Sequence, residues 1–123
     1  MFEQRVVFRF EAAHELGSNV GDPSHDYAHI HGHSFEATLI LRGEPDPEKG
    51  WLIDFAEVRA EAETIRGLLD HRLLNAVEGL GKPTLENLSK FIFERTKKAL
   101  PPLAAVEVAR PSLGETVRYE HSA

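Results

Sequence analysis

The amino-acid sequence predicts an α+β domain in which an antiparallel sheet carries two helices on one face. The chain begins with two segments whose apolar residues alternate with polar ones, the pattern of half-buried strands. Two segments with apolar residues at helical spacing follow, and a second pair of expected strands closes the chain. The expected order is therefore β-β-α-α-β-β, within a single domain of residues 1–123.

Composition and charge restrict the possible partners of the chain. The formal charge is −6, from 14 basic and 20 acidic residues, which argues against nucleic acid and membrane surfaces as partners. The charge does not exclude a small anionic substrate, because such a substrate needs only a local basic patch. Cysteine is absent, which excludes disulfides, thiolate metal ligands and a cysteine nucleophile. With no apolar run of membrane-spanning length and no signal-peptide pattern, we expect a cytoplasmic protein.

The first half of the sheet is expected from residues 2–13 and 33–43, where apolar residues recur at every second position. Residues 15–30 are rich in turn formers, and a loop of that length in a small domain is usually functional. The second half of the sheet is a hairpin, with residues 104–109 and 115–121 on either side of a Pro-Ser-Leu-Gly turn.

Each expected helix has a capping residue and an apolar stripe. Asp54 is expected to cap the first helix, which ends near Leu69, and Thr84 to cap the second, which Pro101 and Pro102 stop. The first stripe consists of Phe55, Val58, Ala62, Ile65 and Leu69. The second stripe consists of Leu85, Leu88, Ile92, Thr96 and Ala99.

Three histidines are expected to share one face at the end of the sheet. His14 has the parity of the apolar residues in the first strand, and His31 and His33 have that of the second strand. Three imidazoles with an open fourth position are the ligand set of a catalytic zinc ion. Any one of them alone could equally be a strand-end histidine held by hydrogen bonds. His29 has the same parity and could compete as a ligand from the preceding loop.

Asp70 and His71 form a second candidate site, a possible catalytic pair. A carboxylate that fixes the tautomer of an imidazole makes the ring a better base or proton relay. Neighbouring side chains on a helix cannot easily reach each other, so this pairing requires a turn at Asp70-His71. The alternative is a helix C-terminus that is stabilised by a histidine.

Six short motifs, taken in order, resemble the 6-pyruvoyltetrahydropterin synthase family, and most closely its bacterial 6-carboxytetrahydropterin synthases of the queuosine pathway. The resemblance runs from residue 7 to about residue 108. The motifs are Phe-Glu-Ala-Ala-His at 10–14, His-Gly-His at 31–33, Gly-Trp-Leu-Ile-Asp-Phe at 50–55, Leu-Asp-His at 69–71, Leu-Asn at 74–75 and Pro-Thr-Leu-Glu-Asn at 83–87.

The resemblance implies a tunnelling fold that assembles into a trimeric barrel, or a dimer of trimers, with sites between subunits. It implies a zinc-dependent lyase that acts on 7,8-dihydroneopterin triphosphate: triphosphate leaves, and the side chain is rearranged or cleaved to 6-pyruvoyl- or 6-carboxytetrahydropterin. The implied zinc ligands are His14, His31 and His33. Asp70 and His71 match the family's proton relay, and Thr84 matches a threonine that helps to hold the pterin.

Two positions depart from the family pattern. The family's cysteine base, four residues before His-Gly-His, is Tyr27 here. The family's pterin-anchoring glutamate falls on Arg110, a donor-only side chain, with Glu115 as the nearest acceptor. These departures support an alternative hypothesis, that the chain is a non-catalytic or functionally diverged zinc-binding paralogue. A small cupin-like metal enzyme is a third hypothesis, against which the two amphipathic helices argue.

Overall fold

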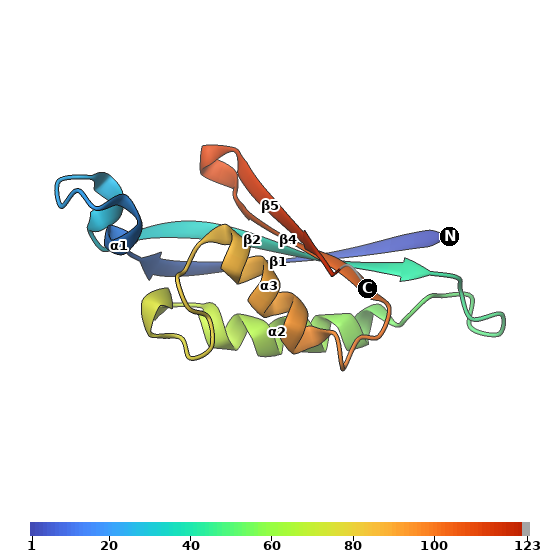
Figure 1. The fold of residues 1–123 in the computed structure, drawn as a ribbon. Helices are drawn as coiled ribbons and strands as arrows, with labels where there is room; N and C mark the ends of the chain where they lie inside the picture. The colour runs from blue at the N-terminus through green and yellow to red at the C-terminus, as the bar shows by residue number, and fades with distance from the viewer. Residues whose placement is uncertain (122–123) are drawn as a thin grey trace.

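The computed structural model of the protein describes residues 1–121, and it contains a five-stranded sheet with its long helices on one face (Figure 1). The strands are β1 (Phe2–His14), β2 (His31–Gly43), β3 (Arg72–Leu73), β4 (Leu103–Arg110) and β5 (Glu115–Glu120). The α-helices are α1 (Gly17–Val20), α2 (Phe55–Leu69) and α3 (Leu85–Thr96), and the 3-10 turns are η1 (Asp26–Ala28), η2 (Leu74–Ala76) and η3 (Pro111–Leu113).

The sheet order is β3-β1-β2-β4-β5, and every pairing is antiparallel except that of β3 with β1. The expected α+β fold is confirmed, with three corrections. Strand β3 was not expected, because two residues are too few for a periodic pattern. Strand β2 begins at His31 rather than at residue 33, since its pairing with β1 continues to the pair His14↔His31. The expected loop at residues 15–30 contains α1 and η1.

Both long helices begin at the predicted caps. The Asp54 side chain accepts a hydrogen bond from the Ala56 N–H at 2.9 Å, and the Thr84 hydroxyl accepts one from the Asn87 N–H at 3.2 Å. Two residues that were expected on the buried apolar stripes of these helices are not buried. Phe55 is half-exposed at the first helical position, and Ala99 is exposed because α3 ends at Thr96. Leu100 is buried in its place.

The two faces of the sheet differ in chemistry. The helix side holds the apolar core, to which alternate residues of β1, β2 and β4 contribute. The opposite side carries ion pairs such as Arg9–Glu36 at 3.0 Å and Arg5–Glu107 at 2.8 Å. The apolar face ends at the tip of β1 and the start of β2, where the three histidines lie. Among residues 1–121, no helix has both the length and the apolar character that crossing a membrane requires.

Candidate metal centre

Three histidines converge where β1 ends and β2 begins. His14 and His31 are a register pair, and His33 lies opposite Ala12 on the same face. The centroids of the three rings are 4.7–5.1 Å apart, and the rings meet edge to face. One nitrogen from each ring lies within 4.8 Å of the other two, so the three residues form a group that could hold a metal ion. His29, the possible competitor, is exposed and lies outside this group.

The Nε2 nitrogens of the three rings favour the binding of a metal ion. The Nε2 atoms of His14, His31 and His33 are all buried and have no hydrogen-bond partner in the described part of the chain. Buried polar atoms without partners are rare in proteins. His14 Nδ1 donates to the Pro83 carbonyl at 2.8 Å, and His31 Nδ1 donates to the His29 carbonyl at 2.7 Å. In the neutral rings of His14 and His31 these bonds leave a lone pair on Nε2, so the residues fit a divalent ion such as zinc.

The surroundings of His14 and His33 favour the neutral form of these two rings. Burial lowers the pKa of His14, and the charges of His31 and Arg110 lower it further. Burial, then His14 and Arg110, lower the pKa of His33 to about 4. A metal binds the neutral imidazole, so a depressed pKa removes the competition from protons at neutral pH.

Tyr27 lies against one of the three histidines. Its ring is nearly parallel to that of His31, with 5.9 Å between the centroids and an angle of 21°. Turn η1 holds it there: the Tyr27 carbonyl accepts from the Leu16 N–H at 2.6 Å, and its own N–H donates to His25 Nδ1 at 3.1 Å. The structure therefore brings Tyr27 next to the cluster, on the long loop that sequence analysis marked as functional.

Asp70 and His71 make the predicted pair, and a turn makes it possible. Helix α2 ends at Leu69, Asp70 is extended, and His71 adopts the left-handed conformation with φ of 58°. Asp70 Oδ2 then lies 2.9 Å from His71 Nδ1 and 3.2 Å from Arg66, while Asp70 Oδ1 accepts from the Glu11 N–H at 2.9 Å. The hydrogen bonds from Glu11 and His71 and the charge of Arg66 lower the pKa of Asp70.

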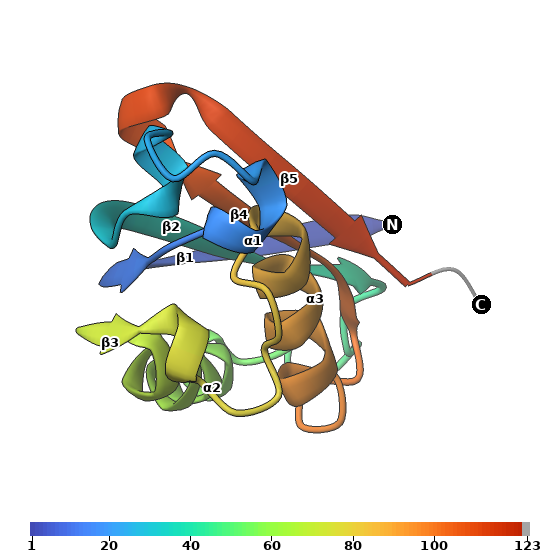
Figure 2. The same ribbon diagram turned by 60° about the vertical axis from the view of Figure 1, so that its left-hand side comes forward.

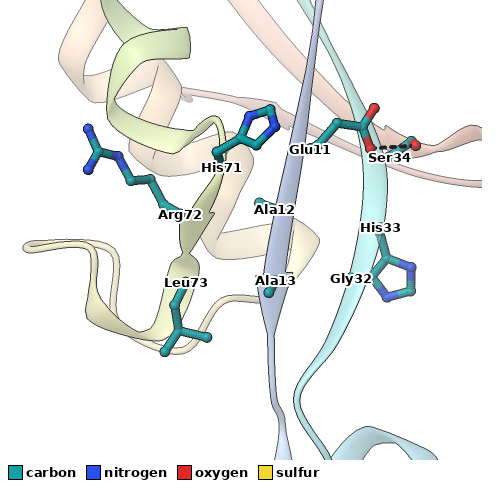
Figure 3. Close-up of a pocket in the computed structure, with 9 residues that line it drawn as sticks. All are labelled: Glu11, Ala12, Ala13, Gly32, His33, Ser34, His71, Arg72 and Leu73. Carbon is teal, nitrogen blue, oxygen red and sulfur yellow. Dashed lines mark hydrogen bonds between the residues drawn. The ribbon is translucent and has the colours of Figure 1, made fainter.

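The Asp70–His71 pair and the cluster lie apart within one chain. A pocket of about 530 Å³ spans β3, β1 and β2, with His71 and Glu11 on one side and His33 on the other. Figure 3 shows the His71 ring leaning toward Glu11, while the His33 ring points away from β1. Glu11 itself accepts a hydrogen bond from the Ser34 hydroxyl at 2.7 Å. The side chain of His71 is 79% exposed, so it is available to a second molecule.

Arg110 and Glu115 face each other at the end of the β4–β5 hairpin. They are a register pair, and their side chains form an ion pair at 2.8 Å. Both lie on the cluster's face of the sheet, at the end of the molecule that also holds the 15–30 loop (Figure 2). Thr84 directly follows Pro83, whose carbonyl fixes His14. That backbone acceptor was missed by sequence reasoning, because no residue type signals it.

Comparison with known proteins agrees with this arrangement. The sequence model of the family described as 6-pyruvoyl tetrahydropterin synthase matches residues 3–122. The chain is 33% identical over 113 residues to the dihydroneopterin monophosphate aldolase of Pyrococcus furiosus, covering 90% of this chain and 89% of the relative. It is 34% identical over 107 residues to the 6-carboxy-5,6,7,8-tetrahydropterin synthase of Synechocystis sp., covering 82% of this chain and 80% of the relative.

Solved structures give the same result. The structure of Caenorhabditis elegans 6-pyruvoyl tetrahydropterin synthase superposes with a TM-score of 0.84 at 25% identity, covering 98% of this chain and 96% of that one. The Plasmodium falciparum 6-pyruvoyl tetrahydropterin synthase shares the fold, with a TM-score of 0.68 at 16% identity, covering 97% of this chain and 99% of that one. From the whole-length match and the shared tunnelling fold, the chain belongs to the 6-pyruvoyl tetrahydropterin synthase family of pterin enzymes.

Proposed function

We propose that the protein is a zinc-dependent pterin synthase that acts on 7,8-dihydroneopterin triphosphate. The observation that carries this proposal is that three neighbouring histidines have buried Nε2 atoms with no hydrogen-bond partner among residues 1–121. The product is 6-carboxytetrahydropterin or 6-pyruvoyltetrahydropterin, formed as triphosphate leaves. A zinc ion bound by His14, His31 and His33 would supply Lewis-acid chemistry, which makes the side-chain hydroxyls of the substrate more acidic.

The residues around the cluster donate, exchange and position protons during the reaction. Tyr27 stands where the family has its base, and its phenol suits proton donation or positioning better than base catalysis. His71 exchanges protons with the substrate, while Asp70 holds its ring in one tautomer. Since His71 lies apart from the cluster of its own chain, it serves the cluster of a neighbouring chain in a homo-oligomer, a trimer or a dimer of trimers.

The pterin ring is held by a rearranged set of side chains. Arg110 cannot accept hydrogen bonds from the ring's N–H groups. Glu115 can, and it is 45% exposed, although one of its oxygens already holds Arg110. Thr84, beside the Pro83 carbonyl that fixes His14, is the second polar group for the pterin.

A retro-aldol reaction is the second candidate, favoured by the Pyrococcus furiosus relative and by the absence of cysteine. In 7,8-dihydroneopterin monophosphate, the side chain would break between its first and second carbons. The second hydroxyl would lose a proton, and the first carbon would gain one. The products are 6-hydroxymethyldihydropterin and glycolaldehyde phosphate. This reaction needs no base to remove a carbon-bound proton in its first step, so the missing thiol does not impede it.

Product analysis tests both candidates. Zinc-loaded protein is incubated separately with dihydroneopterin triphosphate and monophosphate, and the products are identified by mass spectrometry. Chelator-treated protein and the His31→Ala variant serve as controls. Release of triphosphate with formation of 6-carboxy- or 6-pyruvoyltetrahydropterin supports the synthase, whereas 6-hydroxymethyldihydropterin from the monophosphate supports the aldolase. If zinc-loaded protein binds both substrates but changes neither, the protein is a non-catalytic paralogue and both reactions are wrong.

A further inference from the structure

Arg110 has an unused hydrogen-bond donor beside the histidine cluster. Its side chain is only 13% exposed, and its Nη2 atom is 2.8 Å from Glu115. Its Nε atom is buried and has no hydrogen-bond partner in the described residues. A buried guanidinium with a free N–H group is costly to maintain unless something accepts from it. The hydrogen-bonding capacity of Arg110 is therefore incomplete in the protein alone.

The position of Arg110 places this donor toward the cluster. Strand β4 pairs with β2 so that Val108 lies opposite Ala37, and the alternation of side chains puts Arg110 on the same face as His33. The guanidinium of Arg110 and the imidazole of His33 thus lie on the same face at the same end of the sheet.

The donors of Arg110 leave room for an anion. Glu115 pairs with Nη2 of Arg110, and the buried Nε atom has no acceptor among the described residues. A guanidinium matches the oxygens of a phosphoryl group in geometry as well as in charge. The ring of a pterin instead offers N–H donors to this region, which Arg110 cannot accept.

We propose that Arg110 forms an anion subsite that holds a phosphoryl group on the substrate's side chain, next to the histidine cluster. Glu115 orients the guanidinium through the one carboxylate oxygen that pairs with it, which leaves the second oxygen for the pterin ring. This inference rests on the proposed pterin function, since both candidate substrates carry a phosphoryl group at the end of the side chain. Arg110 then favours phosphorylated over unphosphorylated pterins. Where the family has a glutamate that accepts hydrogen bonds from the pterin ring, this chain has an arginine that donates hydrogen bonds to the phosphoryl group of the substrate's side chain.

Binding measurements on zinc-loaded protein test the subsite. Oxidised neopterin, neopterin monophosphate, neopterin triphosphate and glycerol 3-phosphate are titrated calorimetrically into the wild type and the variants Arg110→Gln, Arg110→Lys and Arg118→Gln. Arg118 is the matched control, because it lies on the same hairpin but pairs with Glu107 and Glu120 on the opposite face. Circular dichroism and zinc content show whether each variant is folded and loaded.

We expect Arg110→Gln to weaken binding of the two neopterin phosphates about 10- to 100-fold, the effect of losing charge-assisted hydrogen bonds. Neopterin itself should change less than about threefold, and Arg118→Gln should bind like the wild type. Arg110→Lys should be intermediate, because the ammonium keeps the charge but not the planar fork. If Arg110→Gln does not fold, the lysine variant alone decides: it must lose affinity for the phosphates selectively, and unchanged binding contradicts the subsite.

The outcomes separate this inference from the proposed function. Equal losses for neopterin and its phosphates in the Arg110 variants, or no loss for the phosphates, would overturn the subsite while pterin binding by the wild type stands. If the wild type binds no pterin but holds glycerol 3-phosphate in a way that Arg110→Gln abolishes, the subsite stands and the pterin function is wrong.

Discussion

At the scale of single residues, the clearest feature is that His14 and His33 resist protonation. An imidazole with a pKa lowered by burial is neutral in the folded chain at a pH where it would be charged in the unfolded chain. Between about pH 4 and 6.5 the unfolded state therefore binds more protons at His33 than the folded state does. By linkage, the metal-free protein must lose stability as the pH falls through this window.

Thermal unfolding of the metal-free protein at several pH values measures this effect. The melting temperature of the wild type should fall on going from pH 6.5 toward pH 4, and it should fall less steeply in a His33→Gln variant, which has no charge to gain. His25→Gln is the control, since His25 is exposed and lies outside the cluster. Equal slopes for the wild type and His33→Gln would show that His33 is not held neutral by the fold.

Tyr27 and His71 test the proposed division of proton transfer. Tyr27→Cys restores a more acidic group at the family's base position, so turnover of dihydroneopterin triphosphate should rise at least about tenfold. His71→Asn should lower it by about 10²-fold, because the imidazole is lost. Asparagine tolerates the left-handed conformation of residue 71, so this variant keeps the turn. No gain from the first variant, with no loss from the second, would favour the binding paralogue.

The cluster could be predicted from residues because strand parity is a strong constraint. Parity put His14 on the apolar face of the first strand, and His31 and His33 on that of the second. The register that pairs His14 with His31 could not be predicted, because the second strand was expected to begin at residue 33. The Arg110–Glu115 ion pair could not be predicted, since it depends on which residues of the hairpin stand opposite each other. The distance between His71 and the cluster depends on the short strand β3, which the pattern does not reveal.

At the scale of elements, the helix starts were predictable and the short elements were not. Asp54 and Thr84 cap the helices as expected, because the caps act through local hydrogen bonds that the sequence determines. The two-residue strand β3 pairs with β1, and the short elements α1 and η1 pack against each other; all three are too short to show a periodic pattern. Phe55 fits the helical spacing, yet it is half-exposed at the first turn, where the helix has not reached the core.

The Asp54 cap gives a measurable test of this account of α2. Asp54→Ala removes the acceptor for the Ala56 N–H and should lower the free energy of unfolding by about 1 kcal/mol, measured by urea denaturation. Asp54→Ser keeps an oxygen at the cap and should recover most of that loss. Equal stability of the alanine variant and the wild type would mean that α2 is held by packing alone.

At the scale of the whole molecule, the sheet is incomplete as a single chain. In the part of the chain that the structure describes, β5 is the last strand in the order and has no strand on its outer edge, and β3 covers only two residues at the other end. Open edges of this kind favour pairing with another chain. We expect a closed oligomer, a trimer whose sheets join into a barrel or a dimer of such trimers, in which a neighbour's His71 approaches the cluster.

Light scattering at micromolar concentration measures this assembly. The mass should correspond to three or six copies of the 13.8 kDa chain. Substituting Val117 by Pro removes an N–H group from the edge strand and should lower the mass. Since that change can also unfold the hairpin, circular dichroism accompanies it. A stable wild-type monomer would contradict both the barrel and the shared site.

The central claim is that His14, His31 and His33 form a zinc centre, and anomalous X-ray scattering from crystals of the zinc-loaded protein tests it most directly. Data collected on either side of the zinc absorption edge locate the ion independently of the protein. We expect one peak per chain, about 2.0–2.1 Å from all three Nε2 atoms, that is kept in His29→Ala and lost in His31→Ala. A fully loaded crystal with no peak at this cluster, or with its peak on other side chains, would contradict the account.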